Sequence, residues 1–334
     1  MKRMMVGVLA GAMALAVCDA WAQTRTQTVA LEKGWNAVWL EVQPDNRSLT
    51  EVFEGLPVDI VAGYSTPVSE AQFVKNTAVN VQTLAGWNVW YAPYRADAPL
   101  SRLHRLNGST GYLIHALDAA TLTLQGTVLG DRLRWTPNRF NLVGFSVAAQ
   151  GGPTFKEFFQ GAKSHNHNKI YRLANGVWRQ VLAPASEALR SGEAFWIYCD
   201  GASEYQGPLS VKANSSMGLL LNGSLQGTLE FANASPYPLA YSMAQVADNG
   251  NAVLPLAAMV ISIATNMPGP ASIPVPLPDG TEAQDFPALD AGAGLSLPLV
   301  LRIGEMSPGS RTGMFKVTTD LGTETWVPVR ATIE

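Results

Sequence analysis

The residues best suited to metal chemistry form a single short cluster. The segment 164–168 contains a His-x-His pair, His165 and His167. On a strand both imidazoles would point the same way, but a zinc site takes three or four ligands. The other two histidines, His104 and His115, lie in a separate part of the chain. We therefore expect a polar loop here, with His165 and His167 only weak metal candidates, and we predict no cofactor.

The sequence contains no recognisable catalytic motif. It has no Gly-x-Ser-x-Gly elbow, His-Glu-x-x-His helix, P-loop or Gly-x-Gly-x-x-Gly turn. The two carboxylates with a recognisable local role are Glu51 and Glu157, and each is expected to cap a helix. A β scaffold can still bring distant Asp and Glu together for sugar hydrolysis. We expect no enzymatic activity, and an extracellular polysaccharide hydrolase is the alternative.

Tryptophan is the remaining chemical signal. The chain has 9 tryptophans, and seven of them lie between positions 35 and 196: Trp35, Trp39, Trp87, Trp90, Trp135, Trp178 and Trp196. Tryptophan has a flat apolar face and is enriched at binding hot spots, although it also fills the cores of small β units. If these residues form a binding platform, the best candidates are Trp39, Trp87, Trp90 and Tyr91.

A tandem repeat positions these residues. Residues 34–42 (GWNAVWLEV) return as residues 139–147 (RFNLVGFSV). Alternate positions agree between the copies and predict the buried face of a strand: Asn36, Val38, Leu40 and Val42 match Asn141, Val143, Phe145 and Val147. On the other face Trp39 is matched by Gly144, a difference that we expect only where a face is partly exposed.

Further landmarks follow in the same order in both copies. Residues 48–55 match residues 154–161, and each segment predicts a short helix with a capping box and a closing glycine at Gly55 or Gly161. The segments GYLIH at 111–115 and AFWIY at 194–198 match as strands, and each is followed by a Gln-Gly pair. The sequence therefore predicts two β-rich repeats, residues 28–128 and 132–211. The first has about 20 extra residues near Ser65–Ala85.

The chain changes character after the second repeat. From about Asn214 aromatic residues become rarer, and short apolar strands recur between turn signals. The predicted strands are 218–222, 227–233, 239–246, 252–263, 272–277, 295–303, 313–319 and 325–333. This pattern is typical of an antiparallel sandwich of the immunoglobulin type over residues 214–334. The overall fold class is therefore mainly β.

The N-terminus predicts export. Residues 1–22 have a positive start, an apolar core and an Ala-Trp-Ala cleavage site, which indicates a signal peptide cleaved after Ala22. A rival interpretation makes Cys18 a lipidated cysteine. Otherwise Cys199 is the only cysteine of the mature chain, and we expect it to be a buried apolar residue. The apolar core is too short for a membrane span, so we predict no transmembrane segment in the mature chain.

Charge narrows the class of partner. The formal net charge is −3. Residues 1–22 carry Lys2, Arg3 and Asp19, a net +1, so the mature chain carries −4. Basic clusters are absent after the first residues, so nucleic acid is a poor partner. The expected partner is a protein or glycan of the envelope or the exterior.

Two segments carry a family resemblance. The segments TLEFANASP at 228–236 and GMFKVTTDLGTETWVPVRATI at 313–333 resemble strands of immunoglobulin-like domains that end bacterial surface and secreted proteins. The repeats resemble GWN-type modules of uncharacterised bacterial exoproteins, although the second copy has Arg-Phe-Asn in place of Gly-Trp-Asn. This resemblance implies a secreted or periplasmic protein for binding, adhesion or surface assembly. A structural subunit of an envelope assembly is a further alternative.

Overall fold

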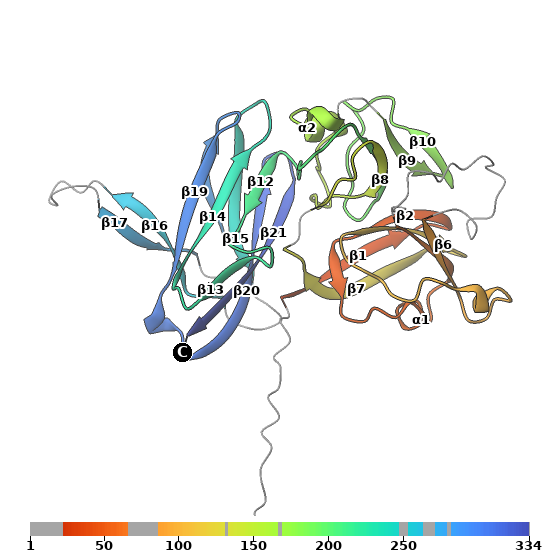
Figure 1. The fold of residues 1–334 in the computed structure, drawn as a ribbon, viewed down its shortest axis with the longest axis horizontal. Coiled ribbons are helices and arrows are strands. Elements are labelled where there is room, and N and C mark those ends of the chain that lie inside the picture. The colour runs from red at the N-terminus through yellow and green to blue at the C-terminus, as the bar shows by residue number, and fades with distance from the viewer. Residues whose placement is uncertain are drawn as a thin grey trace, which may run out of the picture.

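The computed structural model describes residues 23–65, 86–130, 133–165, 169–246, 253–262, 271–278 and 282–333. The fold is mainly β, with several antiparallel sheets and two short α-helices, which confirms the fold class expected from the sequence (Figure 1). The predicted signal peptide, Cys18, nearly all of the extra segment near Ser65–Ala85, and His167 lie outside the described residues.

The first repeat consists of two sheets and a helix. The three-stranded sheet has the order β1 (Thr24–Leu31), β7 (Ala120–Val128), β3 (Val42–Pro44). The four-stranded sheet has the order β2 (Gly34–Leu40), β6 (Thr110–Ala116), β4 (Val58–Tyr64), β5 (Trp87–Tyr91). Helix α1 (Leu49–Val52) precedes β4, and the 3-10 turn η2 (Ala98–Leu100) follows β5.

The second repeat reproduces the four-stranded sheet. Its order is β8 (Arg139–Val143), β11 (Phe195–Cys199), β9 (Ile170–Ala174), β10 (Val177–Gln180), with α2 (Phe155–Phe159) and η3 (Lys163–His165) before β9. The order β8-β11-β9-β10 is the order β2-β6-β4-β5 with equivalent strands in equivalent places. Asn175 and Gly176 both have positive φ, as a two-residue hairpin between β9 and β10 requires.

The shared asparagine has the same task in both copies. Asn36 accepts a hydrogen bond from the Glu32 N–H and donates to the Glu32 carbonyl, and Asn141 does the same with Thr136. Each amide closes the turn before its strand. The repeated asparagine therefore shapes the backbone and is not available to a ligand.

The two helix caps differ more than the sequence suggested. Thr154 forms the expected capping box with Glu157. Ser48 makes no side-chain cap, because Asn46 donates to the Glu51 carboxylate and accepts from the Ser48 N–H. The reciprocal capping box predicted in the first repeat is therefore wrong, although the helix forms.

The closing glycines also differ. Gly55 has φ +75°, as a left-handed helix terminus requires. Gly161 does not adopt positive φ. A Cβ at Gly161 would lie 1.8 Å from the carbonyl oxygen of Ala234, so this glycine permits close approach to the C-terminal domain and is not a helix terminus of the predicted kind.

From Ala37 to Leu40, strand β2 is buried on both faces, which corrects the expectation of a partly exposed face at Trp39. Val38 and Leu40 belong to the core of the first repeat. Ala37 and Trp39, on the opposite face, belong to the core of the second repeat. The Trp39 N–H also donates to the Gly192 carbonyl at 2.9 Å. The two repeats therefore share a packed interface.

The C-terminal domain is a sandwich of two five-stranded sheets. One sheet has the order β12 (Leu209–Lys212), β14 (Gln226–Asn233), β19 (Gly294–Leu301), β16 (Leu256–Ser262), β17 (Ala271–Pro276). The other has the order β13 (Leu219–Asn222), β21 (Glu324–Ile333), β20 (Gly309–Thr319), β15 (Leu239–Val246), β18 (Ala283–Leu289). Three features differ from the sequence expectation: β13 pairs with β21 in parallel, β18 is an additional strand, and β12 joins this sandwich.

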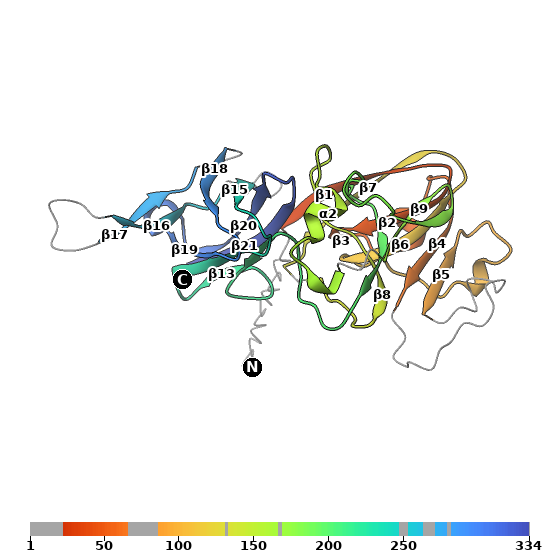
Figure 2. The same ribbon diagram turned by 90° about the horizontal axis from the view of Figure 1, so that it is seen from above.

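The sandwich is joined to both repeats at one end (Figure 2). The turn between β20 and β21 pairs with the second repeat through a bridge between Val147 and Thr323. The Gln23 amide, at the start of the first repeat, donates to the Val329 carbonyl. No helix in the described part of the chain is long and apolar enough to cross a membrane.

Candidate functional site

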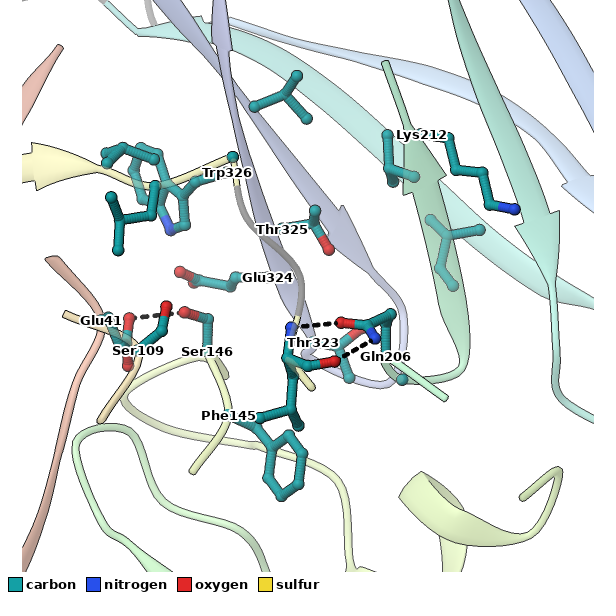
Figure 3. A pocket seen from close by; sticks show the side chains of 18 of the residues that line it. Glu41, Ser109, Phe145, Ser146, Gln206, Lys212, Thr323, Glu324, Thr325 and Trp326 are labelled. Atoms are coloured by element: carbon teal, nitrogen blue, oxygen red, sulfur yellow. Dashed lines mark hydrogen bonds between the residues drawn. The ribbon is translucent and has the colours of Figure 1, made fainter. Parts of the chain in front are cut away.

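A cleft of about 750 Å³ lies where the two repeats and the sandwich meet. Figure 3 shows its walls. The first repeat contributes Glu41, the second contributes Ser146 and Gln206, and the sandwich contributes Glu324 and Trp326. Because each part of the chain supplies one wall, this cleft exists only in the assembled molecule.

Glu41 is the central polar residue of the cleft. Its side chain is only 5% exposed and pairs with Arg25. It also accepts hydrogen bonds from the hydroxyls of Ser146 at 2.7 Å and Ser191 at 3.2 Å. These donors compensate the desolvation of a buried carboxylate, and two of them come from the second repeat. Glu41 therefore holds the repeats together.

A second set of charged residues surrounds Trp326, on the sandwich side of the cleft. The guanidinium of Arg25 is 4.7 Å from the centre of the Trp326 ring, and the Lys316 ammonium is 5.4 Å from the same ring. Lys316 also pairs with Glu324 at 2.8 Å. Cation–π contacts of this kind contribute about 0.5–2 kcal/mol each. Both Glu41 and Glu324 are thus paired with cations, so neither carboxylate lacks a charged partner in the cleft.

The structure places most of the predicted platform residues inside the molecule. Trp39, Trp90 and Tyr91 are each about 5–6% exposed. Trp39 packs between the repeats, and Trp90 contacts Phe53 in the core of the first repeat, with ring centres 5.6 Å apart. Trp87 alone among the four is half-buried. The structure does not bring the four together as one exposed surface.

A different set of aromatic rings is partly exposed. These rings come from the second repeat's sheet and the adjoining edge of the first repeat, and we call them the aromatic face: Phe140, Tyr171, Trp178, Trp196, Tyr198, Tyr64 and Trp87. Phe140 is 38% exposed and the other six are half-buried. Trp87 is the only predicted platform residue among them.

Strand alternation gathers this face. Phe140 lies opposite Tyr198, and Trp196 lies opposite Tyr171. Alternate residues point to one side of a sheet, so these four share a side, while their neighbours Phe195 and Ile197 point into the core beneath α2. The aromatic face is therefore built on regular strands, which hold its rings more rigidly than loops would.

The rings contact one another across the face. Phe140 lies 5.2 Å from Tyr198 and 5.6 Å from Tyr171, measured between ring centres. Trp196 lies 4.9 Å from Tyr64 of the first repeat and 6.1 Å from Trp178. The contacts are edge-on, as quadrupole interactions favour. Neighbouring rings thus hold one another in place.

Sequence reasoning missed this face because it applied strand alternation only to the first strand of each repeat. The alternation of Trp196 and Tyr198 on the matched strand 194–198 was the available signal. Applying the period of two to that strand would have placed Trp196 and Tyr198 on one side, whereas the position of Phe140 opposite Tyr198 depends on how β8 and β11 pair.

Of the two histidine candidates, the structure describes only His165. His165 is 3% exposed, and its Nε2 lies 2.9 Å from the Ser203 hydroxyl. Its ring centre is 4.0 Å from that of Trp135. Burial lowers the pKa of His165 to about 4. The described residues contain no group of three or more His, Cys, Asp or Glu suited to a metal ion.

Cys199 lies in the core of the second repeat. The side chain is fully buried and its thiol donates to the Gly201 carbonyl at 3.2 Å. Burial raises the pKa of the Cys199 thiol, which disfavours the reactive thiolate.

Comparison with known proteins leaves the family open. No family model and no curated protein matches the chain. Among solved structures, the ASH/PapD-like domain 7 of human CEP192 aligns with 38% of this chain and 85% of its own, at 5% identity and a TM-score of 0.23. Escherichia coli alpha-2-macroglobulin activated by porcine elastase aligns with 94% of this chain, at 10% identity and a TM-score of 0.21. The chain spans about a third of that macroglobulin.

Proposed function

We propose that this protein is a non-enzymatic binding protein of the bacterial envelope or exterior, and that the aromatic face is its partner-binding surface. The observation that carries the proposal is a row of partly exposed rings on a rigid sheet, spanning both repeats. Tyrosine and tryptophan bury large areas on binding at small cost in conformational entropy. The export signal expected from residues 1–22 supports the proposal, because an exported protein would meet an envelope glycan or protein.

Binding arrays test this proposal. The mature chain, residues 23–334, is applied to glycan arrays and to arrays of envelope proteins, beside Phe140→Ala and Trp178→Ala. We expect binding to one class of partner and at least a tenfold loss in each variant. Tyr237→Ala is the matched control, because this tyrosine is 62% exposed on the sandwich, outside the aromatic face. Binding that both face variants retain in full would contradict the proposal.

The cleft favours a second candidate, an extracellular polysaccharide hydrolase. Its walls include three carboxylates, Glu41, Glu204 and Glu324. Glycosidases act through such a pair of carboxylates. Release of reducing sugar by the mature chain, abolished in Glu324→Gln, would support this candidate. An assay that shows no release from polysaccharides bound by the protein would leave the cleft with a structural role.

A further inference from the structure

Each repeat carries one pair of contacting rings at the same place in its sheet. In the first repeat Trp35 on β2 lies opposite His115 on β6, with ring centres 5.0 Å apart. In the second repeat Phe140 on β8 lies opposite Tyr198 on β11, with ring centres 5.2 Å apart. Because the strands are equivalent, the two pairs occupy equivalent positions. The duplication has thus kept a ring pair while changing all of its residues.

Core packing does not account for these pairs. In the described part of the chain, none of the four rings belongs to a hydrophobic core cluster or to the apolar residues packed against one. Trp35, His115 and Tyr198 are half-buried, and Phe140 is exposed. The two rings of the first pair are set at 59° to each other and those of the second pair at 69°, so each pair forms an angled aromatic corner.

Polar groups lie beside each pair. The Nδ1 of His115 is 2.5 Å from the buried carboxylate of Asp59, which fixes the orientation of the imidazole. The ammonium of Lys169 lies 4.3 Å from the centre of the Tyr198 ring. Each corner therefore combines an apolar ring surface with hydrogen-bonding groups at its border.

One hairpin joins the two pairs. Cδ1 of Trp35 lies 4.0 Å from the place where a Cβ would stand at Gly176, in the turn between β9 and β10. The same hairpin carries Trp178 and Tyr171, and Tyr171 contacts Phe140. The first pair thus lies at one end of the β9–β10 hairpin and the second pair lies beside its base.

We propose that the pairs Trp35–His115 and Phe140–Tyr198 are two equivalent subsites for one polysaccharide chain. Sugar rings present flat C–H faces that pack on aromatic rings, and their hydroxyls bond to groups such as the Lys169 ammonium and the Tyr198 phenol. Two equivalent subsites fit a ligand whose own units repeat. Engaging both at once raises apparent affinity by about 10²–10⁴ over a single subsite. This inference rests on the proposed function and names its ligand class.

The test uses the polysaccharide fraction of the producing bacterium's envelope and medium, cut to defined lengths. The mature chain, Trp35→Ala, Phe140→Ala, the double variant and Tyr237→Ala are titrated with short and long oligomers. We expect long oligomers to bind at least 10-fold tighter than short ones in the native chain and in Tyr237→Ala. Each single variant should lose that length dependence, and the double variant should lose binding. Thermal melts of each variant establish that it is folded.

Three outcomes would overturn the inference in different ways. Equal affinity for short and long oligomers, with loss of binding in Phe140→Ala alone, would refute the paired subsites and leave glycan binding intact. Binding of a protein partner that depends on Phe140, without any polysaccharide binding, would refute the ligand class and retain the aromatic face. Polysaccharide or protein binding that none of the variants affects would refute both this inference and the proposed function.

Discussion

The two repeats have the same strand order and opposite shapes at the surface where they meet. Trp39 of the first repeat and Gly144 of the second are equivalent positions, and they pack against each other. A Cβ at Gly144 would lie 2.4 Å from the Cβ of Trp39, so only glycine leaves room for the indole. Two identical copies would have opposed Trp to Trp or Gly to Gly, and neither arrangement gives this fit.

The fit is reciprocal. Leu142 of the second repeat projects toward Gly111 of the first, where a Cβ would lie 2.7 Å from the Leu142 Cγ. The equivalents of these residues are Ala37 and Ala194. Each copy thus offers one large residue and one glycine to the other. Divergence between the repeats has therefore made their surfaces complementary. Neither copy alone can bury its own projecting residue.

Removing the largest projecting residue tests the comparison most severely. We expect Trp39→Ala to lower the free energy of unfolding by about 3–5 kcal/mol, because a buried indole leaves a cavity between the repeats. Urea denaturation of the mature chain measures the loss. Trp35→Ala is the matched control, since Trp35 lies outside the cores, and it should cost far less. Equal losses in the two variants would show that the inter-repeat contact adds little.

Filling the glycine position tests the other half of the fit. We expect Gly144→Ala to cost about 3 kcal/mol, at the upper end for overpacking, because the added methyl group also meets the Glu193 carbonyl oxygen at 2.5 Å. Gly304→Ala is the control, because nothing lies within 4 Å of a Cβ at that position.

A double variant measures how much of that cost is due to the indole. Trp39→Gly removes the Cβ and Cγ that the new methyl group would meet, so Gly144→Ala should cost less in that background. The same urea denaturation measures the free energy of unfolding of the single and double variants. If Gly144→Ala lowers it equally in the native and Trp39→Gly backgrounds, the two positions do not interact.

The sequence revealed the repeat but not the relation between its copies. Alternation identified Val38 and Leu40 as core residues, because a period of two is local information. The same pattern could not show that Trp39 meets Gly144, since that contact depends on how two separate sheets pack. The aromatic face was hidden for a related reason: its rings become neighbours only when β8, β9 and β11 pair.

The two repeats also differ in the setting of a histidine, and this difference makes stability depend on pH. His115 of the first repeat is oriented by Asp59, whereas His165 of the second is buried and its pKa is lowered to about 4. A lowered folded-state pKa means that the unfolded chain binds a proton first as pH falls below 6.5. Stability is therefore full above pH 6.5 and should fall by about 2–3 kcal/mol by pH 4, as one pKa unit corresponds to about 1.4 kcal/mol.

Urea denaturation at pH 7.5, 5.5 and 4 measures this loss. His165→Gln retains a polar group that can reach Ser203 but cannot take up the proton, so its stability should depend less on pH over this range. An identical pH dependence in the native chain and His165→Gln would assign acid sensitivity to other groups.

The smallest expected effect separates the two helix caps. Thr154 bonds to the Glu157 N–H through its side chain, so Thr154→Ala should cost about 1 kcal/mol. Ser48 makes no such bond, and Ser48→Ala should cost only a few tenths of that amount. Thermal melts of the two variants make the comparison. Asn46→Ala removes the substitute partner of Glu51. If Asn46 has taken over the capping role in the first repeat, this variant should lose more stability than Ser48→Ala. The N-termini of the two duplicated helices would then be stabilised by different side chains.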